Sequence, residues 1–320
     1  MKKITLLFFF LSLNIVSQES KLKRVDKIVK SYRDFNTIEA LAKQIDNDYS
    51  TAIEKARAAY SWISMNLTYN NKNPFEISNT TIYVVSDQND YIRRVQKNDE
   101  KIMMKAFKTK SAVCKGYALL FKRICDLLKI ENQLVLGYIK NSSYQIGYMP
   151  SQKNHAWNVI KIDGKWIFID PTQGSGYSIK NVWQPKFNPD FFNIKKDILK
   201  NTHFAEKTYW RNYVNQMPLK EFSRLPVFSK AYFNSSFDIV SPSNGLIEAK
   251  KKRPIQLRFK DIDFDTKIHY KFGEYSKLKK ANVTYSNSIF WIQIQSPRED
   301  STLKIYVDGE EALSYLVYVK

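Results

Sequence analysis

Three residue types in this chain could together perform thiol chemistry: a cysteine, a histidine and an aspartate, in the order Cys114, His155 and Asp170. A cysteine thiolate can attack a carbonyl carbon, and a histidine can move the proton between the thiol and the leaving group. A carboxylate hydrogen-bonded to the histidine holds its ring in the required tautomer. The elements that carry these residues decide whether they can meet.

The segment around Cys114 favours a reactive thiol. Ser111 is the expected N-cap of a helix, and apolar residues recur at spacings of three and four from Tyr117 to Leu128. Cys114 then lies in the first turn, where the helix dipole and free N–H groups stabilise an anion. Lys115 adds positive charge, and the Cys114 amide points where an oxyanion would form. The alternative is a buried structural cysteine, the commonest fate of a free cysteine.

The second cysteine, Cys125, fits that structural alternative because it falls mid-helix on the apolar face. Eleven residues separate it from Cys114, or about 16 Å along one helix. A disulfide requires Cα atoms within about 7 Å. The two thiols are therefore not expected to pair.

A β-hairpin is expected to bring the histidine and the aspartate together. Asp163-Gly164 is a strong two-residue turn signal between strands 155–162 and 165–170. In that register His155 and Asp170 lie on one face as diagonal neighbours. A solvated surface pair would look the same in sequence. Metal binding is disfavoured because the three histidines and two cysteines lack ligand spacing, and no cofactor is expected.

Three motifs resemble those of the transglutaminase-like superfamily of papain-like cysteine enzymes. Ala112–Ala118 resembles the nucleophile motif, Asn154–Asn158 the histidine motif, and Asp163–Trp166 with Asp170–Thr172 the aspartate motif. Trp62-Ile63 with Tyr69 resembles the upstream helix signature, so that the resemblance covers residues 50–176. Ala112 stands where glycine is usual and Gln173 where tryptophan is usual.

A looser resemblance points to the kyphoscoliosis-peptidase-like branch. Gly174-Ser175-Gly176, Thr202-His203-Phe204 and Trp210 carry it, with a β-rich tail behind them. His203 lies outside the three motifs and is interpreted as structural.

The resemblance implies an α+β fold, with a cysteine-bearing helix packed on an antiparallel sheet. It also implies that Cys114, His155 and Asp170 act on peptide or glutamine-type amides through a thioester. Hydrolysis is favoured over transfer to an amine, although the residues themselves leave this choice open. Four residues are expected to wall the substrate site: Trp62, Tyr69, Trp157 and Gln173.

The composition of the chain predicts three successive parts. Lys2-Lys3 followed by an apolar stretch predicts a signal peptide over residues 1–17, hence export and no membrane span after its removal. A catalytic domain with a helical N-terminal part is expected over residues 18–240. The Ser-Pro-Ser-Asn-Gly linker opens a small β-sandwich-like domain of the immunoglobulin-like kind over residues 241–320.

Coarser patterns fill in the expected elements. Residues 21–70 look helical, 71–98 look like a long loop, and 99–109 look like a short basic helix. Helical patches are expected within residues 180–235.

The formal net charge of +20 favours anionic partners such as a cell wall. The lysines are scattered among acids, however, which equally fits a solvated surface, and no nucleic-acid-binding signature is present. Two functions remain: an enzyme acting on a protein or peptide, or a binding or scaffolding module that retains the fold.

Overall fold

The computed structural model describes residues 18–71, 86–140, 142–179, 182–214, 216–235, 237–274 and 276–320. Its contacts divide the chain into two units, Met1–Leu136 with Lys153–Lys195, and Gly137–Gln152 with Lys196–Lys320. The expected signal peptide lies outside the described residues. Among the residues that are described, no helix is both long enough and apolar enough to cross a membrane.

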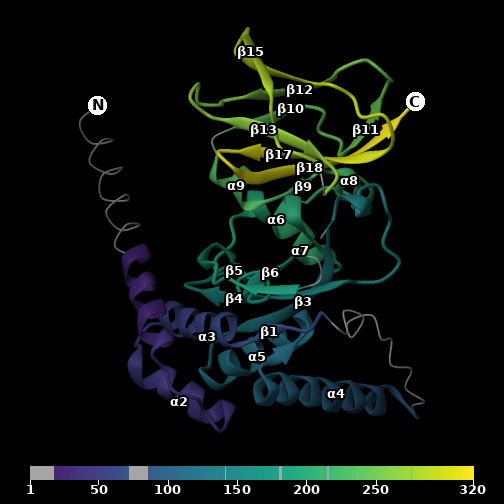
Figure 1. Ribbon diagram of the computed structural model, residues 1–320. Coiled ribbons are helices and arrows are strands. Elements are labelled where there is room, and N and C mark those ends of the chain that lie inside the picture. The colour runs from purple at the N-terminus through teal and green to yellow at the C-terminus, as the bar shows by residue number, and fades with distance from the viewer. Residues whose placement is uncertain are drawn as a thin grey trace, which may run out of the picture. The chain divides into compact units, whose positions relative to one another are not determined.

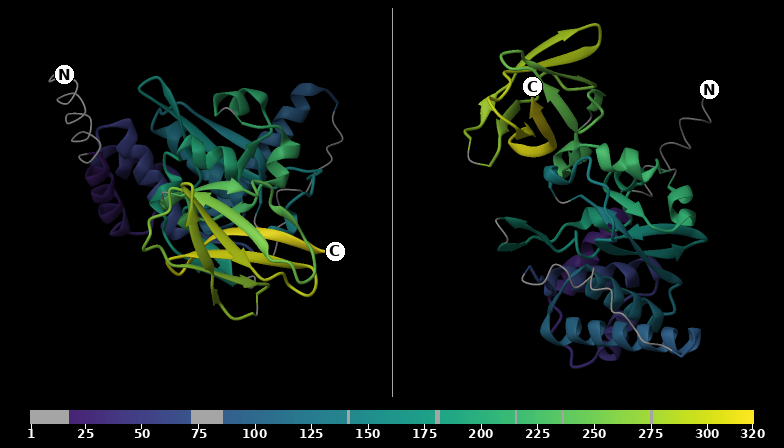
Figure 2. Two further views of the ribbon diagram at one scale, coloured as in Figure 1. Left: turned by 90° about the horizontal axis from the view of Figure 1, so that it is seen from above. Right: turned by 90° about the vertical axis from the view of Figure 1, so that its right-hand side faces the viewer.

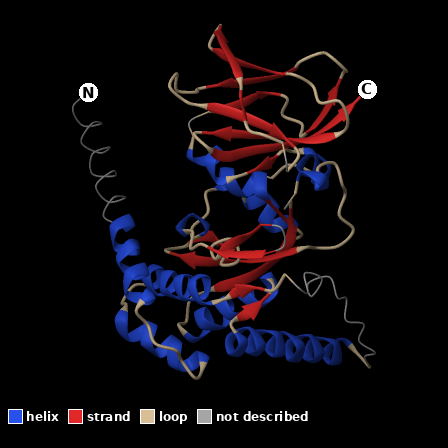
Figure 3. Cartoon of the chain, in the orientation of Figure 1, coloured by secondary structure: helices blue, strands red, loops and turns tan. Residues whose placement is uncertain are grey.

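The first unit combines helices with short strands (Figures 1 and 3). A helix over residues 18–30 precedes the labelled elements. These elements are α2 (Ile38–Asp48), α3 (Ala52–Asn66), β1 (Thr68–Tyr69), α4 (Gln88–Thr109), β2 (Ser111–Ala112), α5 (Cys114–Leu127), β3 (Asn132–Ile139), β4 (His155–Ile162), β5 (Lys165–Ile169), β6 (Gly176–Ile179), β7 (Val182–Pro185) and the 3-10 turn η3 (Pro189–Phe191). The last residues of β3 belong to the second unit.

Side-chain caps begin three of these helices. The side chains of Thr37, Thr51 and Asp87 accept hydrogen bonds from first-turn N–H groups of α2, α3 and α4. Such caps satisfy donors that have no partner within the helix. Helix α5 differs, because its N-cap is Val113, which has no side-chain acceptor.

Helix α4 is twice as long as the sequence predicted. Residues 88–98, read as loop, are helical and continuous with the expected helix over 99–109. The first half has little apolar periodicity because its side chains are mostly exposed. It is held by the Asp87 cap and by the Asp90–Arg94 ion pair one turn apart.

The sheet of this unit carries α5 on one face. Strand β4 lies between β5 and β3, and β4 pairs antiparallel with β5 from Ile162–Lys165 to Asn158–Ile169. Helix α5 packs against β4 and α4 (Figure 1). The expected architecture, a cysteine-bearing helix on an antiparallel sheet, is therefore confirmed.

A buried ion pair fastens the first helix to α3. The guanidinium of Arg57 donates to both carboxylate oxygens of Asp26 at 2.8 Å, and the Ser61 hydroxyl donates to the same carboxylate at 2.6 Å. The Arg57 side chain is almost fully buried and also lies over the Tyr60 ring. Its charge therefore depends on Asp26 for compensation.

Replacing Asp26 by alanine should lower the free energy of unfolding by about 3–5 kcal/mol, because it leaves a buried guanidinium unpaired. The matched control is Asp46→Ala, which removes the exposed partner of Lys55. That variant should cost at most about 1 kcal/mol. Urea denaturation of both variants measures the difference. Equal losses would contradict the structural role given to Asp26.

The second unit holds short helices followed by two sheets. Its elements are the end of β3, η2 (Ser143–Gln145), α6 (Lys196–Thr202), β8 (His203–Ala205), α7 (Thr208–Tyr213), α8 (Leu219–Arg224), β9 (Val227–Phe228), α9 (Lys230–Asn234), β10 (Asp238–Ser241), β11 (Leu246–Ala249), β12 (Ile255–Lys260), β13 (Ile268–Phe272), β14 (Lys279–Lys280), β15 (Asn282–Ser286), β16 (Ile289–Ile294), β17 (Ser301–Val307) and β18 (Glu310–Val319).

Two mainly antiparallel sheets form a β-sandwich in this unit (Figure 2). One sheet has the order β10-β12-β16-β15, and the other has β11-β18-β17-β13-β14 with β9 beside β18. Buried residues of both sheets share one core, among them Leu257 and Ile292 from the first and Leu303 and Leu313 from the second. The expected strand-rich C-terminal region is thus present, with β11 parallel to β18 as an addition.

The boundary predicted between residues 240 and 241 differs from the division in the structure. Strand β10 ends at Ser241 and pairs with β12, and β9 pairs with β18. The second unit therefore begins before the Ser-Pro-Ser-Asn-Gly stretch, which is a loop inside it. Proline and glycine mark turns wherever they occur, so they could not distinguish a loop within a sandwich from a linker between domains.

Candidate active site

Cys114 is the first residue of α5, at the one start among α2 to α5 that lacks a side-chain cap. The prediction of Ser111 as N-cap is wrong, because Ser111 and Ala112 form β2 and pair in parallel with Thr68 and Tyr69. The uncapped first turn leaves backbone N–H groups and the positive end of the dipole for an anion. The thiolate of Cys114, or an oxyanion formed on a carbonyl it attacks, is such an anion.

The start of α5 is packed too closely for a side chain at Gly116. A Cβ atom there would lie 2.7 Å from the Cβ of Ala112 and 3.3 Å from that of Ala106. Glycine therefore lets the first turn of α5 approach β2 and α4. The neighbouring Lys115 does not add free positive charge as expected, since its ammonium lies 2.6 Å from the Asp99 carboxylate on α4.

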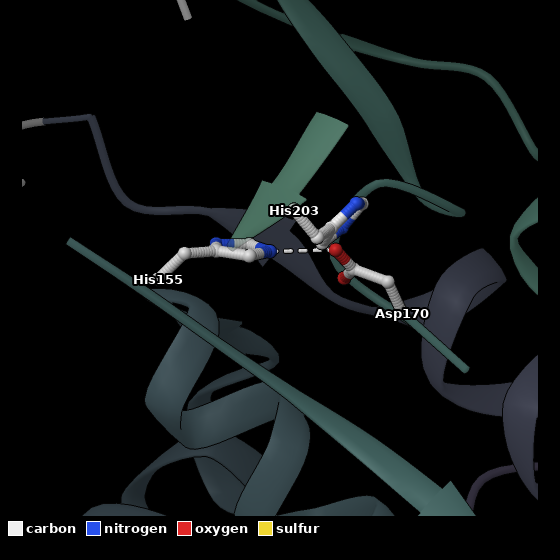
Figure 4. A group of neighbouring side chains, drawn as sticks. All are labelled: His155, Asp170 and His203. Carbon is white, nitrogen blue, oxygen red and sulfur yellow. Dashed lines mark hydrogen bonds and ion pairs between the residues drawn. The ribbon is translucent and has the colours of Figure 1, made fainter. Parts of the chain in front are cut away.

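His155 and Asp170 are directly bonded. Nε2 of His155 lies 2.6 Å from Oδ2 of Asp170 (Figure 4, which also draws His203 of the second unit). His155 begins β4 and Asp170 follows the end of β5, so the hairpin register predicted from Asp163-Gly164 is the one that joins them. With Nε2 engaged by the carboxylate, Nδ1 is the nitrogen that can exchange a proton with a thiol.

The second carboxylate oxygen of Asp170 fixes the turn that follows. Oδ1 accepts hydrogen bonds from the backbone N–H groups of Thr172 at 2.9 Å and Gln173 at 3.1 Å. The Asp170 N–H donates to the carbonyl of Phe191. The carboxylate thus faces His155 because the backbone on both sides of it is held.

Glycine at position 174 is required by that turn. A Cβ atom there would lie 2.1 Å from the hydroxyl oxygen of Tyr60, a fully buried residue of α3. The Tyr60 hydroxyl donates to the carbonyl of Asn188 and its ring packs against Phe187 and Phe192, which hold it in place. The Gly174-Ser175-Gly176 sequence therefore has a packing reason beside the aspartate.

Electrostatics favour the protonated ring of His155. Burial by itself disfavours the imidazolium, but the Asp170 carboxylate and the neighbouring Cys114 thiol outweigh it and raise the pKa of His155 to about 10. His155 therefore carries a proton at neutral pH. A thiolate and an imidazolium at such a site stabilise each other.

The other thiol, Cys125, is buried too, but it lies away from the helix start and among apolar side chains. Cys125 is free and buried in the main helical core, and burial raises the pKa of its thiol well above the ordinary value. Both cysteines lie on α5 and neither is in a disulfide. The two cysteines differ in their position on α5 as predicted, Cys114 in the first turn and Cys125 in the middle, but both are fully buried.

Residues 39–171 match the family model described as the Transglutaminase-like superfamily. The chain carries a transglutaminase-like domain. Kyphoscoliosis peptidase of Homo sapiens is 24% identical over 215 residues, which cover 66% of this chain and 29% of that protein. Hillarin of Drosophila melanogaster is 20% identical over 249 residues, 73% of this chain and 28% of that protein. The chain spans less than a third of the length of these relatives.

Among solved structures, one described as a TGase is 17% identical, with a TM-score of 0.29. The match covers 53% of this chain and 40% of that one.

A side-chain hydrogen bond that the sequence did not predict joins two elements of the transglutaminase-like domain, the helix α5 that carries Cys114 and the strand β4 that begins with His155. The Asn158 amide, fully buried on β4, donates to the Ala118 carbonyl on α5 at 3.0 Å. It lies three residues from His155 and reaches the first turns of the Cys114 helix. An asparagine next to the apolar residues Trp157 and Val159 was the available signal, because a polar group buried in a strand requires a hydrogen-bond partner.

The four residues expected to wall the substrate site do not all lie beside Cys114 and His155. Tyr69 packs against Cys114, and the Trp157 ring stacks on the His155 ring at 5.8 Å. Gln173 contributes its backbone N–H to Asp170. Trp62 was wrongly expected at the wall, because it is buried in the helical core and stacks on Phe107.

Trp183 of β7 is a neighbour of this wall that the sequence did not reveal. Its ring lies 5.6 Å from the Tyr69 ring, and a Cβ atom at Gly176 would come within 2.8 Å of it. The indole Nε1 of Trp183 is buried and has no hydrogen-bond partner among the residues described. Only the fold brings this residue to β1.

The site is closed in this structure. Cys114 and Asp170 are 0% exposed and His155 is 3% exposed. A substrate can reach the thiol only after side chains around it, such as Tyr69, move.

Proposed function

We propose that the protein is an enzyme that cleaves or transfers amide-linked acyl groups through a thioester on Cys114. The thiolate adds to the carbonyl carbon of a peptide or glutamine-type amide, and the carbon–nitrogen bond breaks. His155 gives its proton to the departing amine and then accepts one from the nucleophile that attacks the thioester. Asp170 keeps the ring in the tautomer with its proton on Nε2.

The observation that carries this proposal is the His155–Asp170 hydrogen bond beside the uncapped start of α5. A structural cysteine requires neither an adjacent imidazolium nor an uncapped helix start. Water is proposed as the usual acceptor of the acyl group, and an amine as the second one. Export is also proposed, from the basic and apolar N-terminal sequence. A protein or peptide substrate is proposed from the resemblance to the family, and an anionic partner such as a cell wall from the net charge of +20.

The alternative is a binding or scaffolding module at the cell surface or in the periplasm. The complete burial of Cys114 favours it, because a module that binds through its surface does not require solvent access to this thiol. The two functions differ in whether the thiol reacts.

Alkylation of the folded protein should separate them. We expect iodoacetamide at neutral pH to modify Cys114 and leave Cys125 intact, because Cys125 is a neutral thiol in the apolar core. Mass spectrometry of proteolytic fragments measures both sites. The same protein is incubated with a peptide library, with and without methylamine, so that carboxylate and methylamide products report water and amine as acceptors.

His155→Ala is the matched comparison for the alkylation. It should slow modification of Cys114 without affecting Cys125. Modification of Cys125 first, or of neither thiol, would favour the binding module.

A further inference from the structure

Strand β15 forms an unpaired edge of the C-terminal sandwich. This strand, labelled in Figure 1, is the last in the order β10-β12-β16-β15, and all five of its residues are exposed. An antiparallel strand directs the N–H and C=O groups of alternate residues away from its one partner. Among the described residues no strand pairs with β15 on that side, so these groups are available to another chain.

On the face of the sheet that points to the core, the side chains of β15 are apolar. Val283 and Tyr285 pair with Ile292 and Phe290, which are buried, so they point to the core side of the sheet. They are nevertheless 38% and 50% exposed. Phe264, which is 79% exposed, lies 5.0 Å from the Tyr285 ring and extends this apolar strip.

The two ends of the edge carry opposite charge. Lys279 and Lys280 lie just before β15 and are exposed. At the other end, exposed Asp263 and Asp265 flank Phe264. The Phe264 ring contacts Phe290, which is the residue on β16 that pairs with Tyr285. A partner must therefore present acidic groups at one end and basic groups at the other.

We propose that this edge binds a second copy of the chain, with β15 antiparallel to β15 about a two-fold axis at Thr284. Val283 of each copy then lies opposite Tyr285 of the other, and the two Thr284 residues lie opposite each other. Aromatic and β-branched pairs of this kind stabilise antiparallel strands. The same axis brings Lys279 and Lys280 of one copy to the Asp263–Asp265 end of the other.

Self-pairing accounts for both charged ends, whereas an acidic peptide would match the lysines and oppose the aspartates. A two-fold interface requires a self-complementary patch, and an antiparallel edge with a basic and an acidic end is one. A single short strand pair buries less than about 1,200 Å², so the dimer should be weak and form in the micromolar range or above.

Sedimentation of the full chain across a concentration series tests the dimer. Val283→Lys should weaken association at least about tenfold, since it places a charge in the apolar strip. The matched control is Val240→Lys, on β10 at the opposite edge of the same sheet and also 38% exposed. That variant should dimerise like the unaltered protein. Equal effects of the two substitutions would overturn the proposal.

Charge exchange identifies the partner. Lys279→Glu with Lys280→Glu should weaken the dimer, and adding Asp263→Lys with Asp265→Lys should restore it. An acidic synthetic peptide that binds the unaltered chain, with no dimer at any concentration, would assign the edge to another partner and overturn the proposal.

The register can be tested by cross-linking. Thr284→Cys should form an intermolecular disulfide on mild oxidation, because opposed Cα atoms lie about 4.5–5.5 Å apart. Ser286→Cys is the control: its two copies would be about 13 Å apart in this register, too far for a disulfide. Equal cross-linking of the two variants would contradict the two-fold axis at Thr284.

Discussion

Replacing Cys114 by alanine should abolish acyl transfer, with a loss of turnover of about 10⁴-fold or more. No other thiol can substitute, because Cys125 is buried in the helical core of the first unit and stays protonated. The fold should be retained, since alanine is a good helix former and the apolar neighbours of Cys114, among them Ala118, Ala156 and Tyr69, can pack against a methyl group. Initial rates of peptide cleavage measure the loss, and circular dichroism checks the fold.

The matched control is Cys125→Ala on the same helix. It removes a buried sulfur from the core and should lower the free energy of unfolding by about 1 kcal/mol or more. Its turnover should remain that of the unaltered protein. Activity that survives in Cys114→Ala, or is lost in Cys125→Ala, would show that the thioester is not formed on Cys114.

Replacing Asp170 by asparagine should lower turnover by about 10²–10⁴-fold. In the unaltered protein both carboxylate oxygens of Asp170 accept hydrogen bonds. Oδ1 accepts from the backbone N–H groups of Thr172 and Gln173, and Oδ2 accepts from His155. An amide has one oxygen, which the two backbone donors will retain. Its NH₂ group then faces Nε2 of His155 and donates to it, which moves the ring proton to Nδ1. That nitrogen can no longer accept a proton from the thiol.

The same substitution should change how the protein responds to pH. The raised pKa of His155 means that its imidazolium stabilises the folded state below about pH 6.5, and that this contribution is lost as the pH rises through about 10. Without the carboxylate, burial should bring the pKa of His155 below its ordinary value. The stability difference between the two proteins should therefore shrink between neutral and strongly alkaline pH.

Nitrogen NMR of His155 reads the tautomer and the titration directly. Asp163→Asn on the same hairpin is the control, because Asp163 is in the turn at φ 49° and asparagine tolerates that conformation. This control should keep both turnover and the His155 titration. An unchanged His155 titration in Asp170→Asn would refute the orienting role of the carboxylate.

Local sequence patterns predicted the geometry of the hairpin. Asp163 and Gly164 both adopt positive φ, the conformation that their residue types favour, and the turn then determines every pair from Ile162–Lys165 onward. The helix that begins at Cys114 was predicted for a similar reason, since its buried residues recur at helical spacing. Signals of this kind lie within a few residues of the structure they specify.

Contacts between distant segments decided the rest. Ser111 is a strand residue because its segment pairs with Thr68 and Tyr69. The N-cap is therefore Val113, whose side chain cannot cap the helix that begins at Cys114. Lys115 was expected to add positive charge beside Cys114, but its ammonium pairs with the Asp99 carboxylate. Trp62 was expected at the wall of the substrate site, but it is buried in the helical core. None of these partners can be identified from the residues beside them.

The sequence by itself determined which residues this protein has for thiol chemistry, and it determined the hairpin that joins His155 to Asp170, because turn type and strand period are local. Only the tertiary structure decided how the thiol is presented. An uncapped helix start, an Asn158 bond between α5 and β4, and a closed site all depend on packing between elements far apart in the chain. Burial and hydrogen-bond partners are properties of the assembled unit, and no short segment contains them.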